Sequence, residues 1–181
     1  MSVSATEKRL ALQGDVSLTL PMNTIELTPY CAGDHGWLVE AHQTLYAQDE
    51  GFDETFGPLV DQILTEFENT SEGQGQRGWI ARKGSRRLGS IFCVRLDEQT
   101  AKLRMFLLVP EARGQGVGRL LLRECMSYAK KAGYARMTLW THASHISACA
   151  LYAKFGWSCV SSKPVKSFGV DLIEQQWEIA F

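Results

Sequence analysis

Three glycines at alternate positions, with an arginine on each side, form the segment of the sequence best suited to chemistry. Gly114, Gly116 and Gly118 follow an apolar run, and Arg113 and Arg119 flank them. Glycine lets backbone N–H groups approach a ligand closely, and the first turn of a helix presents unpaired N–H donors with a partial positive charge. The segment therefore predicts an anion site at a strand-to-helix turn, suited to a pyrophosphate.

Two common phosphate-binding motifs fit this loop poorly. A Walker loop needs Lys followed by Ser or Thr after its last glycine, and neither pair follows here. A dinucleotide-binding fingerprint needs glycine where Arg119 stands, and it lies in a first βαβ unit instead of mid-chain. The pattern that fits is R-x-x-G-x-G, formed by Arg113, Gly116 and Gly118. A glycine-rich turn without a ligand is the alternative interpretation.

A second motif lies further along the chain and reads A-x-x-L-Y-x-x-x-G-W, from Ala148 to Trp157. Together with the loop V-P-E-A-R-G-Q-G-V-G, it resembles the GNAT superfamily of acyl-CoA-dependent N-acetyltransferases, over residues 24–181. Segments 37–54, 101–107 and 167–177 are similar to the acetyltransferase half that is fused to MarR-type bacterial regulators. Because residues 1–22 are too few for a winged-helix half, we expect the acetyltransferase half alone.

The resemblance implies acetyl-CoA as the cosubstrate and assigns residues to it. The strand over residues 101–109 would splay from its neighbour, and its last backbone positions would pair with the pantetheine arm: Leu107, Leu108 and Val109. The pyrophosphate would be held by consecutive residues of the loop: Arg113, Gly114, Gln115, Gly116, Val117, Gly118 and Arg119. Tyr152 matches a tyrosine that protonates the leaving thiolate in many members, a step worth about 10²–10⁴ in rate. Its alternative role is that of a packed core aromatic.

Two positions depart from the family pattern. Many members carry Asn, which helps hold the cofactor, seven residues before the tyrosine, where this chain has His145. His145 can still hydrogen-bond the cofactor, or it can simply start a helix that Ser144 caps. Many relatives place a glutamate near the start of the strand over 101–109, whereas this strand begins Ala-Lys-Leu-Arg, without a carboxylate. The usual general base is therefore missing.

The reaction still needs a base. An acceptor amine with a pKa of about 10.4 needs roughly 4 kcal/mol to lose its proton at neutral pH. His142 is one candidate, because histidine has a suitable pKa; its alternative is a polar residue at a strand end. The other candidate is an acidic cluster that could also attract a cationic substrate, or be a solvated loop: Asp49, Glu50, Asp53 and Glu54.

Four residues are candidates for binding the acceptor. His42 and Tyr46 lie one helical turn apart and would line one pocket, with Glu50 a turn further on. Gln175 falls on the apolar face of its strand and needs a buried hydrogen-bond partner, for which a site facing the acceptor is one explanation.

Hydrophobic periodicity predicts the elements that position these residues. Alternation and turn chemistry predict strands over residues 23–31, 78–82, 87–96, 101–109, 136–141, 156–161 and 173–181. Spacings of three and four predict helices over residues 37–47, 56–67, 117–132 and 145–154. We expect Gly33-Asp34 to cap the first helix, Lys83-Gly84-Ser85 to form a hairpin turn and Gly133 to end the third helix.

This order of elements predicts an α+β fold, an α/β sandwich around one mixed and mostly antiparallel sheet with flanking helices. The GNAT resemblance adds a splayed strand pair to that sheet. We expect one domain over residues 23–181, preceded by a loosely ordered segment over residues 1–22.

The net charge of -1, from 19 Lys+Arg and 20 Asp+Glu, makes nucleic acid and anionic membranes poor partners. The basic residues around Lys83, from Arg82 to Arg87, are interpreted as a solvated turn. Five scattered cysteines without C-x-x-C spacing predict reduced thiols, no metal site and a cytoplasmic location. No apolar stretch approaches the roughly 20 residues of a membrane span, and no signal peptide is evident.

We therefore expect an acetyl-CoA-dependent N-acetyltransferase that transfers acetyl to a primary amine by direct attack on the thioester. The amine is a small molecule or a protein amine, and a homodimer is one expected assembly. The alternative is a non-catalytic sensor or interaction module of the same fold, and a nucleotide-binding protein is a third interpretation.

Overall fold

In the part of the chain that the structure describes, the strands form one seven-stranded sheet in the order β1-β2-β3-β4-β5-β7-β6. The computed structural model describes residues 24–70 and 75–181; the expectation for residues 1–22 lies outside them. The strands are β1 (Ile25–Pro29), β2 (Arg77–Lys83), β3 (Arg86–Arg95), β4 (Thr100–Leu108), β5 (Arg136–His142), β6 (Ser158–Ser167) and β7 (Val170–Ala180). Among these strands of the described residues, β4 and β5 alone pair in parallel. The expected α+β fold with a mostly antiparallel sheet is confirmed.

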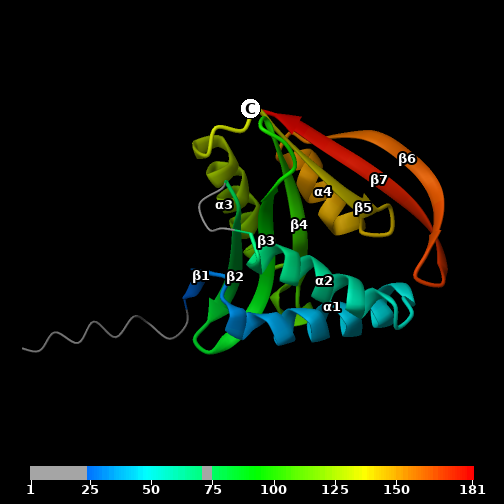
Figure 1. The fold of residues 1–181 in the computed structure, drawn as a ribbon. Helices are drawn as coiled ribbons and strands as arrows, with labels where there is room; N and C mark the ends of the chain where they lie inside the picture. The colour runs from blue at the N-terminus through cyan, green and yellow to red at the C-terminus, as the bar shows by residue number, and fades with distance from the viewer. Residues whose placement is uncertain (1–23, 71–74) are drawn as a thin grey trace, which may run out of the picture.

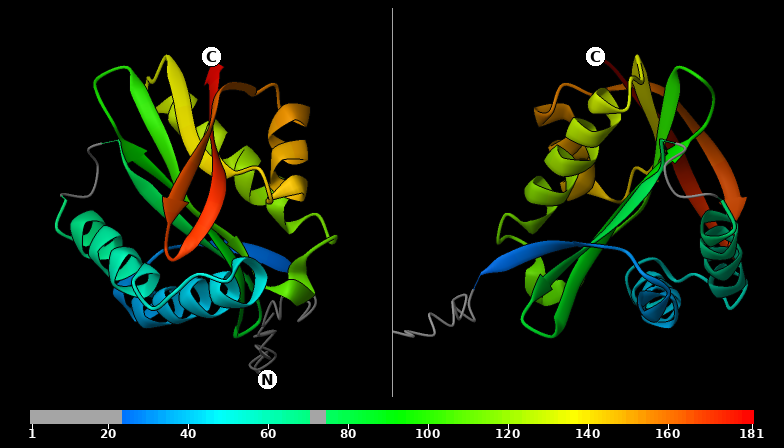
Figure 2. Two further views of the ribbon diagram at one scale, coloured as in Figure 1. Left: turned by 90° about the vertical axis from the view of Figure 1, so that its right-hand side faces the viewer. Right: turned by 60° about the vertical axis from the view of Figure 1, so that its left-hand side comes forward.

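Helices cover both faces of the sheet (Figures 1 and 2). On one face lie α1 (His35–Glu50) and α2 (Phe56–Glu68), and on the other α3 (Val117–Lys131) and α4 (Ile146–Lys154). Leu64 of α2 packs with Ile80 and Phe92 on the first face, and Leu121 of α3 packs with Ile91 on the second. Within residues 24–70 and 75–181, no helix is long and apolar enough to cross a bilayer.

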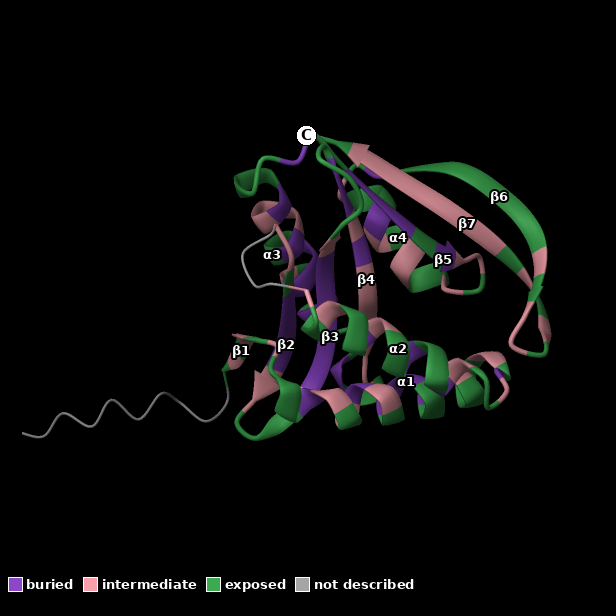
Figure 3. Ribbon diagram, viewed as in Figure 1, coloured by how far each residue is buried: buried purple, intermediate pink, exposed green. Residues whose placement is uncertain are grey.

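The strands β6 and β7 form a longer hairpin than the sequence predicts. Pairing continues to Ser167 and Val170, around a turn at Phe168 and Gly169 whose φ angles are 52° and 80°. Residues 158–164 of β6 are all exposed (Figure 3), so this edge strand shows no alternation of buried and exposed positions. Periodicity depends on one buried face, which explains why strands were expected only over residues 156–161 and 173–181.

A bulge in β4 separates it from β5. Ser90 pairs with Leu107 while Phe92 pairs with Arg104, so β4 has one extra residue, and Met105 there adopts a φ of 52°. The Ser90 hydroxyl donates to the Met105 carbonyl at 2.6 Å and fixes the bulge. Since a bulge bends its strand and increases the local twist, β4 pairs with β5 only at Thr100, Ala101 and Lys102. The splayed pair expected from the resemblance is present.

Asp34 occupies the N-cap position of α1, as expected for Gly33-Asp34, but its side chain makes no cap hydrogen bond to the helix. Its carboxylate is fully buried and makes ion pairs with Arg82 at 2.5 Å and Arg87 at 2.7 Å. Burial works to raise the pKa of Asp34, but hydrogen bonds from Arg87 and Arg82 outweigh it and hold the pKa below its usual value. The interpretation of this basic run as a solvated turn is therefore wrong for Arg82 and Arg87, although Gly84 does form the hairpin turn, with a φ of 59°.

Candidate active site

The glycine loop presents free backbone donors at the start of α3. A short 3-10 turn, Pro110–Ala112, leads from β4 into it, and Gly114 and Gly116 adopt φ angles of 75° and 81°. Among the described residues, the amide N–H groups of residues 114–119 have no hydrogen-bond acceptor, and the first bond of the helix runs from Leu120 to the Gly116 carbonyl. Six neighbouring donors at a helix amino terminus can bind an anion without any rearrangement of their own hydrogen bonds.

Gly118 brings this helix close to β4. A Cβ at this position would lie 3.2 Å from the Leu108 side chain and 3.5 Å from those of Phe106 and Leu151. The first turn of α3 therefore sits against the splayed part of β4, and a larger residue at position 118 would push the two apart.

The two arginines of the loop differ in their contacts. Arg113 makes an ion pair with Asp49 of α1 at 2.7 Å, and its Nε donates to the Leu108 carbonyl at 3.4 Å. Arg119 is exposed, and no side chain in the described part of the protein pairs with it. In this structure Arg119 is available to an anion, whereas Arg113 is held by a carboxylate.

The backbone of β4 alternates between its partner β3 and the open side. The Val109 amide donates to the Leu88 carbonyl at 3.0 Å, and Leu107 pairs with Ser90 of the same strand. Successive residues of a strand direct their backbone groups to opposite sides. Of the three residues expected to pair with a pantetheine arm, Leu108 is therefore the one whose backbone N–H and C=O groups face away from β3.

Tyr152 of α4 lies next to Phe106 of β4, the strand that splays from β5. Its side chain is 3% exposed and packs near the rings of Phe106, Trp157 and Trp177, with centroids 6.0–6.1 Å away. Its hydroxyl has no hydrogen-bond partner among the described residues, yet it is not a fully buried atom. Burial, followed by the neighbouring Tyr46, raises the pKa of Tyr152 well above its usual value, so the phenol keeps its proton.

An aromatic cluster joins the acceptor-side segments. We use this name for rings with centroids 4.6–5.6 Å apart, which come from α1, the α1–α2 loop, α2, β5, the start of α4 and the β6–β7 turn. Its members are Tyr46, Phe52, Phe56, His142, His145 and Phe168. Three residues predicted from the sequence thus meet, although they lie far apart in the chain.

The phenylalanines of the aromatic cluster were not predicted. Phe52 is 4% exposed and touches four of the other rings, and Phe168 stacks on it at 4.8 Å. The Asp53 amide donates to the Phe168 carbonyl at 3.1 Å, and Gly169 lies against the Asp53 side chain. The hairpin turn is therefore fastened to the α1–α2 loop. The available signal was the aromatic-glycine pair Phe168-Gly169 between polar residues.

His142 has an unused nitrogen inside the aromatic cluster. Its Nδ1 is the one buried side-chain nitrogen or oxygen without a hydrogen-bond partner among the described residues. Burial lowers the pKa of His142, and His145 lowers it further, against the opposing effect of Glu50 and Glu174. A neutral imidazole with a free hydrogen-bonding position is suited to accepting a proton.

His145 uses both of its ring nitrogens. Nε2 lies 3.2 Å from a Glu50 carboxylate oxygen and Nδ1 lies 3.2 Å from the Thr141 hydroxyl. Burial lowers the pKa of His145, although Glu50 and Asp49 oppose this shift. The expectation that Ser144 caps the helix is wrong: its hydroxyl donates to Glu50 at 2.7 Å, and His145 holds the cap position without a side-chain cap bond.

The other substrate-binding candidates are less accessible. His42 is 3% exposed and its Nδ1 donates to the Leu38 carbonyl at 2.8 Å, while its ring stacks 6.0 Å from that of Tyr46. Gln175 accepts hydrogen bonds from Trp177 Nε1 at 3.1 Å and from the Cys149 thiol at 3.5 Å. The protein itself thus satisfies the amide oxygen of Gln175, whereas its amide nitrogen has no hydrogen-bond partner among the described residues.

The acidic cluster is more structured than a solvated loop. Asp49 binds Arg113, Glu50 binds His145 and Ser144, and Asp53 accepts from the Thr55 amide at 3.0 Å. Glu54 alone of the four is exposed with no partner among the described residues. The cluster therefore positions loops in addition to supplying negative charge.

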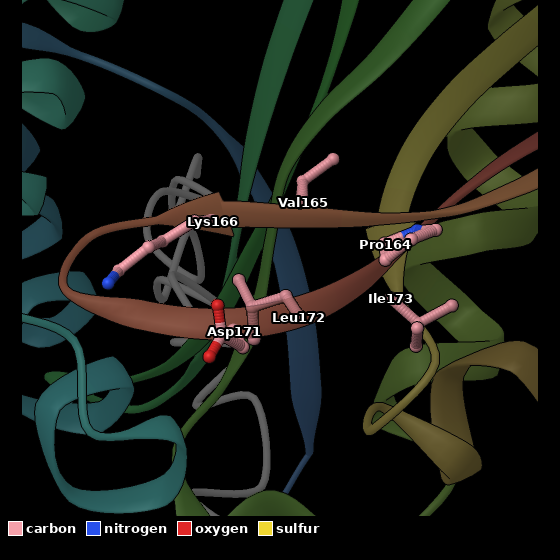
Figure 4. Close-up of a pocket in the computed structure, with 6 residues that line it drawn as sticks. All are labelled: Pro164, Val165, Lys166, Asp171, Leu172 and Ile173. Atoms are coloured by element: carbon pink, nitrogen blue, oxygen red, sulfur yellow. The ribbon is translucent and has the colours of Figure 1, made fainter.

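An open hollow of about 360 Å³ lies on the β6–β7 hairpin near its turn (Figure 4). Its lining is mostly apolar and consists of Pro164, Val165, Lys166, Asp171, Leu172 and Ile173. In the described residues, no group of three or more His, Cys, Asp or Glu side chains could hold a metal ion.

The structure is thus an α+β sandwich in which the splayed β4–β5 pair lies beside unbonded amides at the start of α3. A model of the acetyltransferase (GNAT) family matches residues 39–157, and the chain belongs to this family. Human N-acetyltransferase 8B is 30% identical over 83 residues, which are 43% of this chain and 37% of that protein. The chain thus spans less than half the length of the first curated relatives it matches.

Solved structures share the fold. A GNAT acetyltransferase from Staphylococcus aureus Mu50 gives a TM-score of 0.71 at 19% identity, covering 87% of this chain and 99% of that one. A putative acetyltransferase from Salmonella typhimurium, solved with acetyl-CoA, gives 0.70 at 16% identity, covering 87% and 94%. Spermidine N-acetyltransferase from Vibrio cholerae, solved with CoA and spermine, gives 0.66 at 15% identity, covering 86% and 95%.

Proposed function

We propose that this protein is an acetyl-CoA-dependent N-acetyltransferase that acetylates a primary amine by direct attack on the thioester. The observation that carries the proposal is the set of six free amides at residues 114–119, next to the part of β4 that separates from β5. Structural neighbours solved with acetyl-CoA or CoA support the choice of cosubstrate. The finer likeness to the acetyltransferase half of MarR fusions stays a prediction.

The residues present fit acetyl-CoA. The amides of residues 114–119 and the exposed Arg119 would hold the pyrophosphate, and the open side of Leu108 would pair with the pantetheine amides. The cosubstrate supplies an activated acetyl group as a thioester. His145 does not have a ring nitrogen to offer it, because Glu50 and Thr141 use both.

Tyr152 would act as the general acid. Its hydroxyl is free of protein partners, and its raised pKa keeps the phenol protonated in the free protein. A proton donated to the departing thiolate removes the charge of the leaving group, and such help is worth about 10²–10⁴ in rate.

His142 would act as the general base. Its lowered pKa leaves the imidazole neutral at pH 7, so it can take a proton from the acceptor ammonium. The basic side chains Lys102 and Arg104 occupy the start of β4, and burial lowers the pKa of both. They offer no carboxylate, which leaves the aromatic cluster as the place for the base.

The acceptor would bind next to the aromatic cluster, where Tyr46 and Glu50 lie beside His142 and His145. The spermine in the Vibrio cholerae structure supports amines as acceptors. We propose a primary amine, as a small molecule or on a protein, without a metal, and a homodimer stays an expectation.

The test is a Tyr152→Phe variant, assayed with acetyl-CoA against a panel of primary amines and by calorimetry with CoA. We expect kcat to fall about 10²–10⁴-fold, with CoA affinity unchanged. Tyr128→Phe is the control, because its hydroxyl donates to the Gln76 carbonyl away from the site.

If none of the amines tested supports thioester cleavage although CoA binds tightly, the proposed enzymatic activity is contradicted. NAD or ATP stabilising the protein more than CoA contradicts the cosubstrate; a ligand at 100 times its Kd adds about 2.7 kcal/mol.

A non-catalytic acyl-CoA sensor or interaction module is the second candidate function. It is favoured by Lys102 and Arg104, which stand where many relatives are expected to carry the base. In a sensor, Tyr152→Phe would leave every measured property except local packing unchanged.

A further inference from the structure

An ion pair connects the glycine loop to the acceptor side of the protein. Arg113 Nη2 lies 2.7 Å from Asp49 Oδ2, and the side chains are 47% and 46% exposed. Asp49 belongs to the last turn of α1, next to Glu50, which contacts His145 of the aromatic cluster. An exposed ion pair contributes at most about 1 kcal/mol, so a multiply charged anion bound by the loop can displace the carboxylate.

We propose that Arg113 is a shared ligand: Asp49 binds its guanidinium in the free protein, and the pyrophosphate of the cosubstrate takes it over in the complex. This inference rests on the proposed function, because it requires the pyrophosphate to lie on the amides of residues 114–119. Arg113 directly precedes these amides, and its Nε and Nη2 already bond Leu108 and Asp49. The same donors cannot serve a carboxylate and a phosphate fully at once, so Asp49 competes with the cosubstrate.

The exchange also changes the charge on the acceptor side. While Arg113 holds Asp49, the end of α1 presents a neutralised pair; once Arg113 turns to the pyrophosphate, the Asp49 carboxylate is unpaired beside Glu50. A cationic amine is attracted to the second state more than to the first. Binding of the cosubstrate therefore favours later binding of the amine, and by linkage the amine favours the cosubstrate equally.

The first experiment measures the Kd of CoA by calorimetry at constant ionic strength. We expect Asp49→Asn to tighten CoA binding about fivefold, within the usual range of couplings between sites, and Arg113→Gln to weaken it. In the double variant, Asp49→Asn should add nothing. Glu54→Gln, which removes an exposed and unpaired carboxylate of the same loop, should change the Kd less than about twofold. Unchanged or weaker binding by Asp49→Asn overturns the shared ligand, whereas no CoA binding by the wild type overturns the proposed function itself.

The second experiment uses spermine as a cationic probe, with and without saturating CoA. The wild type should bind spermine about fivefold more tightly when CoA is present. In Asp49→Asn the gain should be less than half as large, because only the charge of CoA remains to attract the probe. An equal gain in both proteins, or no gain in either, overturns the release of Asp49.

Discussion

Glu50 and His145 connect the end of α1 to the start of α4 through a contact of 3.2 Å between Oε1 and Nε2. The other carboxylate oxygen of Glu50 accepts from the Ser144 hydroxyl, so one side chain positions the first turn of the helix that carries Tyr152. The resemblance predicts a cofactor contact at this position, and in this structure His145 joins two helices.

Replacing Glu50 by Ala should destabilise the protein by about 1–3 kcal/mol, because Ser144 and His145 lose an acceptor that is largely buried. The Glu50 carboxylate raises the pKa of His145, so the variant should also show a lower His145 pKa by NMR titration. Glu54→Ala is the matched control and should change the unfolding free energy by less than about 0.5 kcal/mol. Equal stabilities of the two variants would show that the contact has no structural role.

Replacing His142 by Gln should remove the general base while keeping a polar side chain of similar size. At pH 7.5 we expect kcat/KM to fall about 10²-fold or more, and to recover as the pH rises, because the free amine then forms without a base. The wild type should lose activity below pH 6.5, since the pKa of His142 is lowered from that value, and the variant should lack this limb. His35→Gln serves as control, because His35 binds Asp61 and Glu68. A parallel pH profile in His142→Gln would exclude His142 as the base.

The sequence predicted the parts of this protein that depend on local rules. Glycines at 114, 116 and 118, apolar periodicity in α3 and alternation in the inner strands depend on neighbours within a few residues, and each element forms as expected. The family resemblance brought His145 forward, residue chemistry brought His142 forward and helical spacing brought Tyr46 forward as site candidates, and the structure places the three in one aromatic cluster.

Contacts between residues far apart in the chain could not be predicted from the sequence. The ion pairs of Asp34 join residues 48 and 53 positions apart, Asp49 and Arg113 are 64 apart, and Glu50 and Ser144 are 94 apart. The chemical type of a side chain predicts that it can form an ion pair or a hydrogen bond. Which partner it has depends on how the helices pack on the sheet. For the same reason Phe52 and Phe168 were missed, because their role exists only once the hairpin turn reaches the α1–α2 loop.

Replacing Asp34 by Ala should destabilise the protein by about 3–5 kcal/mol, because it leaves Arg82 and Arg87 with unpaired and partly buried charges. The control is Glu111→Ala, which removes an exposed partner of Arg86, with side chains 55% and 67% exposed, and should cost at most about 1 kcal/mol. Urea unfolding followed by tryptophan fluorescence measures both. Similar midpoints for the two variants would contradict a structural role for the buried carboxylate.

His42 should make stability depend on pH in the mildly acidic range. Burial lowers the pKa of His42 from 6.5 to about 4, so between these values the unfolded chain binds a proton that the folded protein rejects. The contribution of His42 to the free energy of unfolding is therefore fully present above pH 6.5. It is lost as the pH drops toward 4, which lowers the free energy of unfolding by up to about 3 kcal/mol.

The variant His42→Leu removes the titrating group. The free energy of unfolding of this variant should vary less over this pH range, whatever its value at pH 7. His35, whose pKa is raised, contributes the opposite slope in both proteins and cancels in the comparison. Parallel curves for the wild type and His42→Leu, from urea titrations at half-unit pH steps, would refute this assignment.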